Sequence, residues 1–164
     1  MKKIEVAFTG PSNSGKTTLI VNIAKRLKEQ NYKVCIVKHD PKDKAMFDKE
    51  GKDSDKFTKT GADVVVVSPN RTTLFKQQTS SIDEIIELFG EFDYLLVEGL
   101  KTLPLPRIAI FRGELDDKYY DMSDVIATDE SISKDELPLS CGYLDLNNYE
   151  EIINWIDKNG KKYE

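Results

Sequence analysis

The stretch of sequence that decides the fold spans residues 10–18, which are Gly10-Pro11-Ser12-Asn13-Ser14-Gly15-Lys16-Thr17-Thr18. It has the spacing G-x-x-x-x-G-K-[ST], which is typical of a loop whose backbone N–H groups cradle phosphates. The apolar run 4–9 before it predicts a strand, and apolar residues at helical spacing over 16–30 predict a helix after it. The alternative is a chance glycine loop before an ordinary helix. Because a strand, a loop and a helix are predicted in the order that a phosphate-binding loop requires, we interpret residues 10–18 as a P-loop.

The motif assigns roles to individual residues of the loop. The residues predicted to bind a nucleotide are Gly10, Ser12, Asn13, Ser14, Gly15, Lys16, Thr17 and Thr18. Backbone N–H groups over 13–17 converge on a phosphate at the positive end of the helix dipole. The Lys16 ammonium lies against the outer phosphates, which also makes it a candidate catalytic residue, and the Thr17 hydroxyl ligates magnesium. The loop therefore predicts a nucleoside triphosphate and Mg²⁺.

An acidic residue at the end of a neighbouring strand is the second part that such a site needs, because it holds the magnesium shell. Glu98 follows the apolar run 92–97, which predicts a buried strand, and ligands of α/β proteins bind at the carboxyl ends of strands. We interpret Glu98 as a metal ligand and Gly99 as a point of close approach to a phosphate. The alternative is that Glu98 merely ends its strand in solvent.

A second strand, predicted over 33–38, ends at the same edge with His39 and Asp40. A carboxylate there could reach magnesium or position an attacking water, so Asp40 is a candidate metal ligand and catalytic residue. A structural role is an equal alternative for Asp40. For His39, the only histidine, structural hydrogen bonding is the simpler interpretation.

Recognition of the base is less visible in the sequence, because the guanine signature N-K-x-D is absent. Asp129 follows the predicted strand 124–128. A carboxylate at this position could accept hydrogen bonds from N1 and N2 of guanine and would reject adenine. Asp129 could equally cap the following turn, and GTP is the favoured nucleotide on this argument.

Strands and helices alternate along the rest of the chain. Further strands are predicted at 62–68, 72–76 and 107–111, and further helices at 54–60, after a Ser81/Glu84 capping box, and from Asn148 to a stop at Asn159-Gly160. The pair 62–68 and 72–76 forms a hairpin about Pro69-Asn70. The pattern predicts one α/β domain over residues 1–164 with a P-loop NTPase fold, in which a doubly wound, mostly parallel sheet carries an antiparallel hairpin.

Composition excludes several classes of function. The net charge of −5 provides no global attraction to nucleic acid or to anionic lipid. No apolar run approaches the length of a membrane span, and the N-terminus lacks a signal-peptide core. The two cysteines, Cys35 and Cys141, form no metal-ligand pattern and no disulfide framework. We expect a cytoplasmic protein that binds neither nucleic acid nor membrane.

Several short motifs occur together with the P-loop in a fixed order. They are Val-Lys-His-Asp at 37–40, Gly-Lys-Asp-Ser at 51–54, Thr-Gly-Ala at 60–62, and Val-Glu-Gly-Leu-Lys at 97–101 before Pro104, Pro106 and Arg107. Over residues 4–129 this set resembles the MobB family of molybdopterin-guanine dinucleotide biosynthesis accessory proteins. The ordered set is far more specific than the P-loop alone.

The resemblance implies a GTP-binding, weakly GTP-hydrolysing homodimer in molybdenum cofactor biosynthesis. Its implied partner is the guanylyltransferase that attaches GMP to molybdopterin, and molybdopterin is a further implied ligand. Two departures from the family pattern stand out: Asp40-Pro41 replaces further histidines after the Lys-His pair, and Arg107 replaces a common lysine. Together, Arg107 and Lys101 are expected to keep positive charge near the carboxyl edge of the sheet. Such charge is compatible with an anionic ligand or partner.

Two other functions compete with the accessory role. A small-molecule kinase using ATP would neutralise the transferred phosphoryl group with several arginines on a lid. The chain has only Arg26, Arg71, Arg107 and Arg112, which form no lid cluster in the sequence. A pure binding module, with incidental hydrolysis, is the third hypothesis. Any enzymatic activity is expected to be that of a weak GTPase at most.

Overall fold

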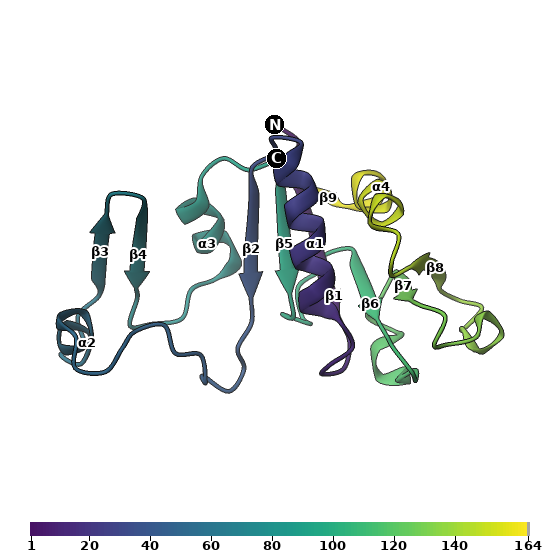
Figure 1. Ribbon diagram of the computed structural model, residues 1–164, viewed down its shortest axis with the longest axis horizontal. Coiled ribbons are helices and arrows are strands. Elements are labelled where there is room, and N and C mark those ends of the chain that lie inside the picture. Colours follow the sequence, from purple (N-terminus) through teal and green to yellow (C-terminus); the bar gives the residue numbers. More distant parts are fainter. Residues whose placement is uncertain (164) are drawn as a thin grey trace. The chain divides into compact units, whose positions relative to one another are not determined.

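The structure, a computed structural model, describes residues 1–163 (Figure 1). Within this range the chain forms two compact units. The first unit combines Met1–His39 with the chain from Glu91 onward, and the second is Asp40–Gly90. The prediction of one domain over 1–164 stays a prediction, and its last residue lies outside the described range.

A sheet of parallel strands forms the centre of the first unit (Figure 1). Its strands are β1 (Ile4–Thr9), β2 (Val34–Lys38), β5 (Tyr94–Glu98), β6 (Arg107–Ile110), β7 (Val125–Thr128) and β8 (Gly142–Asp145). Their order is β2-β5-β1-β6-β7-β8, and every neighbouring pair is parallel. The predicted P-loop α/β fold with a mostly parallel sheet is confirmed, and β1, which leads into the P-loop, lies inside the sheet.

Two strands of the first unit escape the sequence analysis. Strand β8 has the sequence Gly-Tyr-Leu-Asp, which is too short an apolar run to predict a strand, and only its Leu144 is buried. The two-residue strand β9 (Lys161–Lys162) pairs antiparallel with the start of β1, at Ile4 and Glu5. Because β6 pairs with the end of β1 only, β9 completes the hydrogen bonding of β1 on that side.

Helices α1 (Lys16–Glu29) and α4 (Tyr149–Asn159) supply the helical residues of the main core. From α1 the buried residues are Leu19, Ile20, Ile23 and Leu27, and from α4 they are Ile152, Ile153 and Ile156. They pack against β1, β5, β6 and β7 in one cluster. A smaller cluster about Phe111 and Ile132 includes tyrosines of the turn η1 (Asp117–Tyr119) and its flank. In residues 1–163 no helix combines the length and apolar character needed to cross a bilayer.

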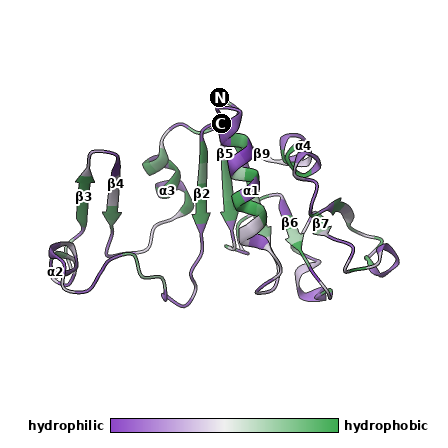
Figure 2. Ribbon diagram, in the orientation of Figure 1, coloured by the Kyte–Doolittle hydropathy of each residue, from purple (hydrophilic) through white to green (hydrophobic). Residues whose placement is uncertain are grey.

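The second unit contains α2 (Asp53–Thr58), β3 (Val64–Ser68), β4 (Arg71–Phe75) and α3 (Ile82–Phe89). The predicted hairpin is confirmed: β3 and β4 pair antiparallel, and Ser68 faces Arg71 across the turn. The predicted capping box is also present, since Ser81 N donates to Glu84 Oε2 at 2.8 Å and Glu84 N donates to Ser81 Oγ at 3.3 Å. Strand β3 is hydrophobic along most of its length (Figure 2).

Candidate nucleotide-binding site

The loop between β1 and α1 has the backbone geometry of a phosphate cradle. Gly10, Asn13 and Gly15 have positive φ values of 137°, 62° and 95°. A Cβ atom at Gly10 would lie 2.3 Å from the carbonyl oxygen of Ile110, so only glycine fits there. Gly15 caps α1 in a left-handed conformation. The predicted sequence of strand, loop and helix is therefore present, with the N–H groups of the first turn of α1 beginning at Lys16.

Two polar side chains of the loop bear on whether a phosphate fits. The Ser14 hydroxyl is buried and has no hydrogen-bond partner among the described residues. A buried hydroxyl of this kind can be satisfied by a ligand. Lys16 is folded back over the loop, because its Nζ donates to the carbonyl oxygens of Gly10 at 2.9 Å and Pro11 at 2.6 Å. Both side chains fit a phosphate. Its oxygens can accept hydrogen bonds from the Ser14 hydroxyl, and they can replace the two carbonyl oxygens as acceptors for the Lys16 ammonium.

Burial lowers the pKa of the Lys16 ammonium from its usual value. The Glu98 carboxylate opposes this shift, and the charges of Lys38 and Lys101 add to it. Glu98, Lys38 and Lys101 thus all act on the Lys16 ammonium at the carboxyl edge of the sheet. An incoming phosphate would stabilise the charged form of Lys16, as Glu98 does.

The structure places Glu98 and Gly99 beside the P-loop strand, as predicted. Glu98 ends β5 in register with Phe8 of β1 and Lys38 of β2. Its Oε2 lies 3.7 Å from Lys38 Nζ. Gly99 has φ 87°, and a Cβ there would lie 3.0 Å from the Cβ of His39, so this turn needs a glycine.

The metal prediction involves Thr17, Glu98 and Asp40. Thr17 lies in the first turn of α1, and Glu98 is the carboxylate on the adjoining strand. Residues 1–163 contain no group of three or more His, Cys, Asp or Glu side chains that could hold a metal ion. A donor set of one hydroxyl and one carboxylate fits Mg²⁺, which is commonly bound by few protein ligands together with phosphates and water.

Asp40 begins the second unit and shapes the chain that follows it. Its carboxylate accepts backbone N–H groups from Lys42 at 3.3 Å, Lys44 at 2.7 Å and Ala45 at 2.6 Å. These bonds give the side chain a turn-forming role. Its predicted catalytic and metal-binding roles stay predictions. His39 donates its backbone N–H to the Glu98 carbonyl at 3.0 Å.

Asp129 follows β7 at the expected edge, and both of its carboxylate oxygens have partners. Oδ2 lies 2.9 Å from Arg112 Nε, and Oδ1 accepts from the backbone N–H and the hydroxyl of Ser131. The hydroxyl bond from Ser131 is the main cause that holds the pKa of Asp129 below its usual value, and Arg112 acts in the same direction. Asp129 therefore does cap a turn, and its role as a guanine reader stays a prediction.

Arg112 is a residue of this edge that the sequence analysis missed. It belongs to no motif, but it follows β6, the neighbour of the P-loop strand. Its Cζ lies 3.6 Å from the position of a Cβ built on Gly15. The only signal in the sequence was a charged residue just beyond the carboxyl end of a buried strand.

Arg107 does not supply the exposed positive charge expected of it. Its side chain is 1% exposed, and its guanidinium donates to the carbonyl oxygens of Gly99 at 2.8 Å, Leu100 at 3.0 Å and Leu103 at 3.1 Å. Burial lowers its pKa, and Asp124 opposes the shift. Arg107 holds the loop after Glu98 in place, because its donors are committed to that loop. The ammonium of Lys101 lies 4.4 Å from the ring centre of Tyr119.

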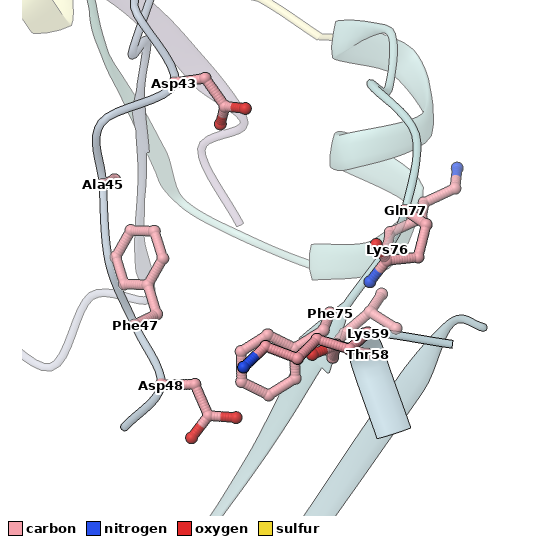
Figure 3. Close-up of a pocket in the computed structure, with 10 residues that line it drawn as sticks. Asp43, Ala45, Phe47, Asp48, Thr58, Lys59, Phe75, Lys76 and Gln77 are labelled. Carbon is pink, nitrogen blue, oxygen red and sulfur yellow. The ribbon is translucent and has the colours of Figure 1, made fainter. Parts of the chain in front are cut away.

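The second unit holds a cavity of about 610 Å³ that no motif predicted (Figure 3). It is lined by Asp43, Ala45, Phe47, Asp48, Thr58, Lys59, Leu74, Phe75, Lys76 and Gln77. Figure 3 shows the rings of Phe47 and Phe75 together with the amine of Lys59 around this space. None of the predicted site residues lines it.

A family model and two curated relatives identify one family for this chain. The family model described as MobB, molybdopterin guanine dinucleotide synthesis protein B, matches residues 5–130. The probable molybdopterin-guanine dinucleotide biosynthesis adapter protein of Bacillus subtilis is 33% identical over 126 residues, which cover 74% of this chain and 73% of that protein. The corresponding adapter protein of Haemophilus influenzae is 28% identical over 160 residues, covering 93% and 86%.

A solved structure shares the fold. The crystal structure of Bacillus subtilis MobB matches with a TM-score of 0.75 and 23% identity, covering 98% of this chain and 99% of that one. At this identity the likeness concerns the fold alone. It agrees with the P-loop architecture derived from the sheet order and the loop.

Proposed function

Since the chain belongs to the molybdopterin guanine dinucleotide synthesis protein B (MobB) family, we propose that it is a GTP-binding, magnesium-dependent adapter protein of molybdenum cofactor biosynthesis. It assists the guanylyltransferase that attaches GMP to molybdopterin, and molybdopterin is a further ligand. The observation that carries the proposal is the family match over residues 5–130, because this range contains the P-loop, Glu98 and Asp129. It acts in the cytoplasm and hydrolyses GTP slowly.

The geometry of the loop supports this nucleotide chemistry. The N–H groups at the start of α1 and the Ser14 hydroxyl bind the phosphates, and Lys16 exchanges its loop carbonyls for phosphate oxygens. Thr17 and Glu98 hold Mg²⁺, which supplies positive charge to the phosphates. Arg107 is committed to backbone carbonyls, so it does not serve the phosphoryl transfer that a kinase performs.

The first expected result concerns magnesium. Wild-type protein should bind GTP more tightly with Mg²⁺ than with EDTA, and Glu98→Gln should remove most of that gain while leaving the magnesium-free affinity unchanged. We expect an effect of about tenfold, because the variant loses one charged ligand interaction. Isothermal titration with GTP and with ATP, each with and without Mg²⁺, measures it.

Glu91→Gln is the matched control, since Glu91 is an exposed carboxylate of the same unit just before β5.

Phosphate release from GTP should be slow, on the order of minutes per turnover, where no arginine is supplied in trans. Preference for ATP with fast transfer to a small acceptor would instead support the kinase hypothesis and end the adapter proposal.

The homodimer forms through the β3–β4 hairpin. Val65, Val67 and Leu74 are 56%, 77% and 42% exposed, and Val65 faces Leu74 across the two strands. Apolar side chains gathered in this way on one surface are typical of a protein–protein interface. Strand β3 has β4 as its single partner among the described strands, so its other edge is open to a second copy.

Val67→Lys is expected to raise the dimer dissociation constant by at least about tenfold, because an unpaired ammonium would be buried at the interface. Analytical ultracentrifugation over a concentration series measures this constant. Val21→Lys is the control, since Val21 is 42% exposed on α1 in the first unit. Equal dimerisation of both variants would place the interface elsewhere.

A further inference from the structure

Arg112 is held in place by a carboxylate that is itself fixed. Its Nε lies 2.9 Å from Asp129 Oδ2, and Ser131 donates two hydrogen bonds to the other oxygen of Asp129. The Asp129 side chain is 15% exposed, whereas that of Arg112 is 45% exposed. The carboxylate is therefore a largely buried anchor, and the guanidinium is a cation that a ligand can reach.

The same guanidinium lies against the P-loop. Cζ, Nε and Nη1 of Arg112 are 3.6 Å, 3.7 Å and 3.7 Å from the position of a Cβ on Gly15. Among residues 1–163, neither terminal nitrogen of Arg112 has a hydrogen-bond partner. Because Asp129 pairs with Nε, the two terminal NH₂ groups are available as a fork, the arrangement that binds phosphate oxygens in pairs.

The sheet order decides which part of a nucleotide this fork meets. Strand β1 lies between β5 and β6, so Glu98 and Arg112 are on opposite sides of the strand that leads into the loop. Magnesium and the outer phosphates belong to the Glu98 side in the function proposed above. The other side is left for the α-phosphate and the nucleoside.

We infer that Arg112 binds the nucleotide at its α-phosphate and nucleoside end, and that Asp129 acts as a positioning residue for Arg112. This inference rests on the proposed nucleotide binding and adds a cation to that site. The ligand class is nucleoside di- and triphosphates, because the α-phosphate is common to both. Arg112 thus contributes to affinity and takes no part in the transfer of the outer phosphoryl group.

The test compares the dissociation constants of GTP, GDP and ATP for wild type, Arg112→Gln, Arg112→Lys and Asp129→Asn. Arg112→Gln should weaken all three nucleotides by about tenfold, as expected for the loss of a charge-assisted contact. The rate of phosphate release at saturating GTP should not change. Arg112→Lys, which keeps the charge without the fork, should recover part of the affinity. Asp129→Asn should weaken GTP and ATP equally, and its effect should be absent in an Arg112→Gln background.

Arg26→Gln is the matched control, since Arg26 is 46% exposed and pairs with Glu150 at 2.8 Å on the same unit. Nucleotide affinity should match wild type in this variant. Thermal unfolding followed by Trp155, the only tryptophan, checks that each variant is folded. If Arg112→Gln does not fold, the affinity of Arg112→Lys relative to wild type decides the question.

Three results would overturn the inference while nucleotide binding stands. The first is a nucleotide affinity of Arg112→Gln equal to that of Arg26→Gln. The second is an Arg112→Gln variant with slower turnover at saturating GTP but unchanged affinity for GDP. The third is an Asp129→Asn variant that changes only the ratio of GTP to ATP affinity. The last result would instead make Asp129 the guanine reader. Failure of the proposed function is distinguishable, because wild type and Lys16→Ala would then bind GTP equally poorly.

Discussion

Replacing Lys16 by Ala is expected to weaken GTP binding by at least about one hundredfold, because the variant loses the ammonium that meets the outer phosphates. In the structure this ammonium is already half-buried and directed at the loop, where it donates to the carbonyl oxygens of Gly10 and Pro11. Little reorganisation is needed before it meets a phosphate. Titration calorimetry with GTP and Mg²⁺ measures the loss.

Lys25→Ala is the control for this experiment, because Lys25 is an exposed lysine on the same helix α1. Its GTP affinity should equal that of wild type. The adapter role gives a second readout: wild-type protein should stimulate the formation of molybdopterin guanine dinucleotide by the guanylyltransferase, and Lys16→Ala should not. Loss of GTP binding with stimulation retained would separate the P-loop from the adapter role.

Replacing Arg107 by Met is expected to lower the free energy of unfolding of the first unit by about 3 kcal/mol. The variant leaves three carbonyl oxygens, of Gly99, Leu100 and Leu103, without their buried donor. The carbonyls of Leu100 and Leu103 keep backbone N–H donors from Leu103 and Leu105. The cost therefore comes mainly from losing the charge-assisted hydrogen bonds of a buried guanidinium, which are stronger than neutral ones. Urea unfolding followed by the fluorescence of Trp155, which lies on α4 of the first unit, measures the change.

Arg26→Met is the matched control for Arg107, since the Arg26–Glu150 pair is exposed on both sides. Exposed pairs contribute roughly 0–1 kcal/mol, so the unfolding midpoint of Arg26→Met should stay close to that of wild type. Similar midpoints for the two variants would mean that Arg107 contributes no more than an ordinary surface arginine. Arg107→Lys should fall between Arg107→Met and wild type, because an ammonium keeps donors but not the planar fork.

Features that depend on neighbouring residues were predictable from the sequence. The P-loop is a contiguous motif, and its glycines are required where the chain approaches Ile110 and turns into α1. The Ser81–Glu84 capping box likewise joins residues three positions apart. In both cases one short segment contains all the chemistry that determines its local conformation.

Three features that depend on contacts between distant segments were not predicted. Arg112 and Asp129 follow different strands, and nothing in either segment indicates that the two side chains meet. The burial of Arg107 is similar, because three carbonyls of a separate loop satisfy its guanidinium. Strand β8 has a single buried residue, so its position beside β7 depends on the sheet and not on its own pattern.

The position of β1 within the sheet has a consequence for folding kinetics. Its partners β5 and β6 both lie beyond residue 90 in the chain, as the pairs Ile4 with Tyr94 and Ala7 with Arg107 illustrate. Bringing such distant segments together costs loop-closure entropy before any contact compensates for it, so topologies of this kind fold slowly. The hairpin at 64–75 needs only local contacts and can form early. A binding motif of nine consecutive residues is therefore expected to become rigid late, when the chain on both sides of the second unit has assembled.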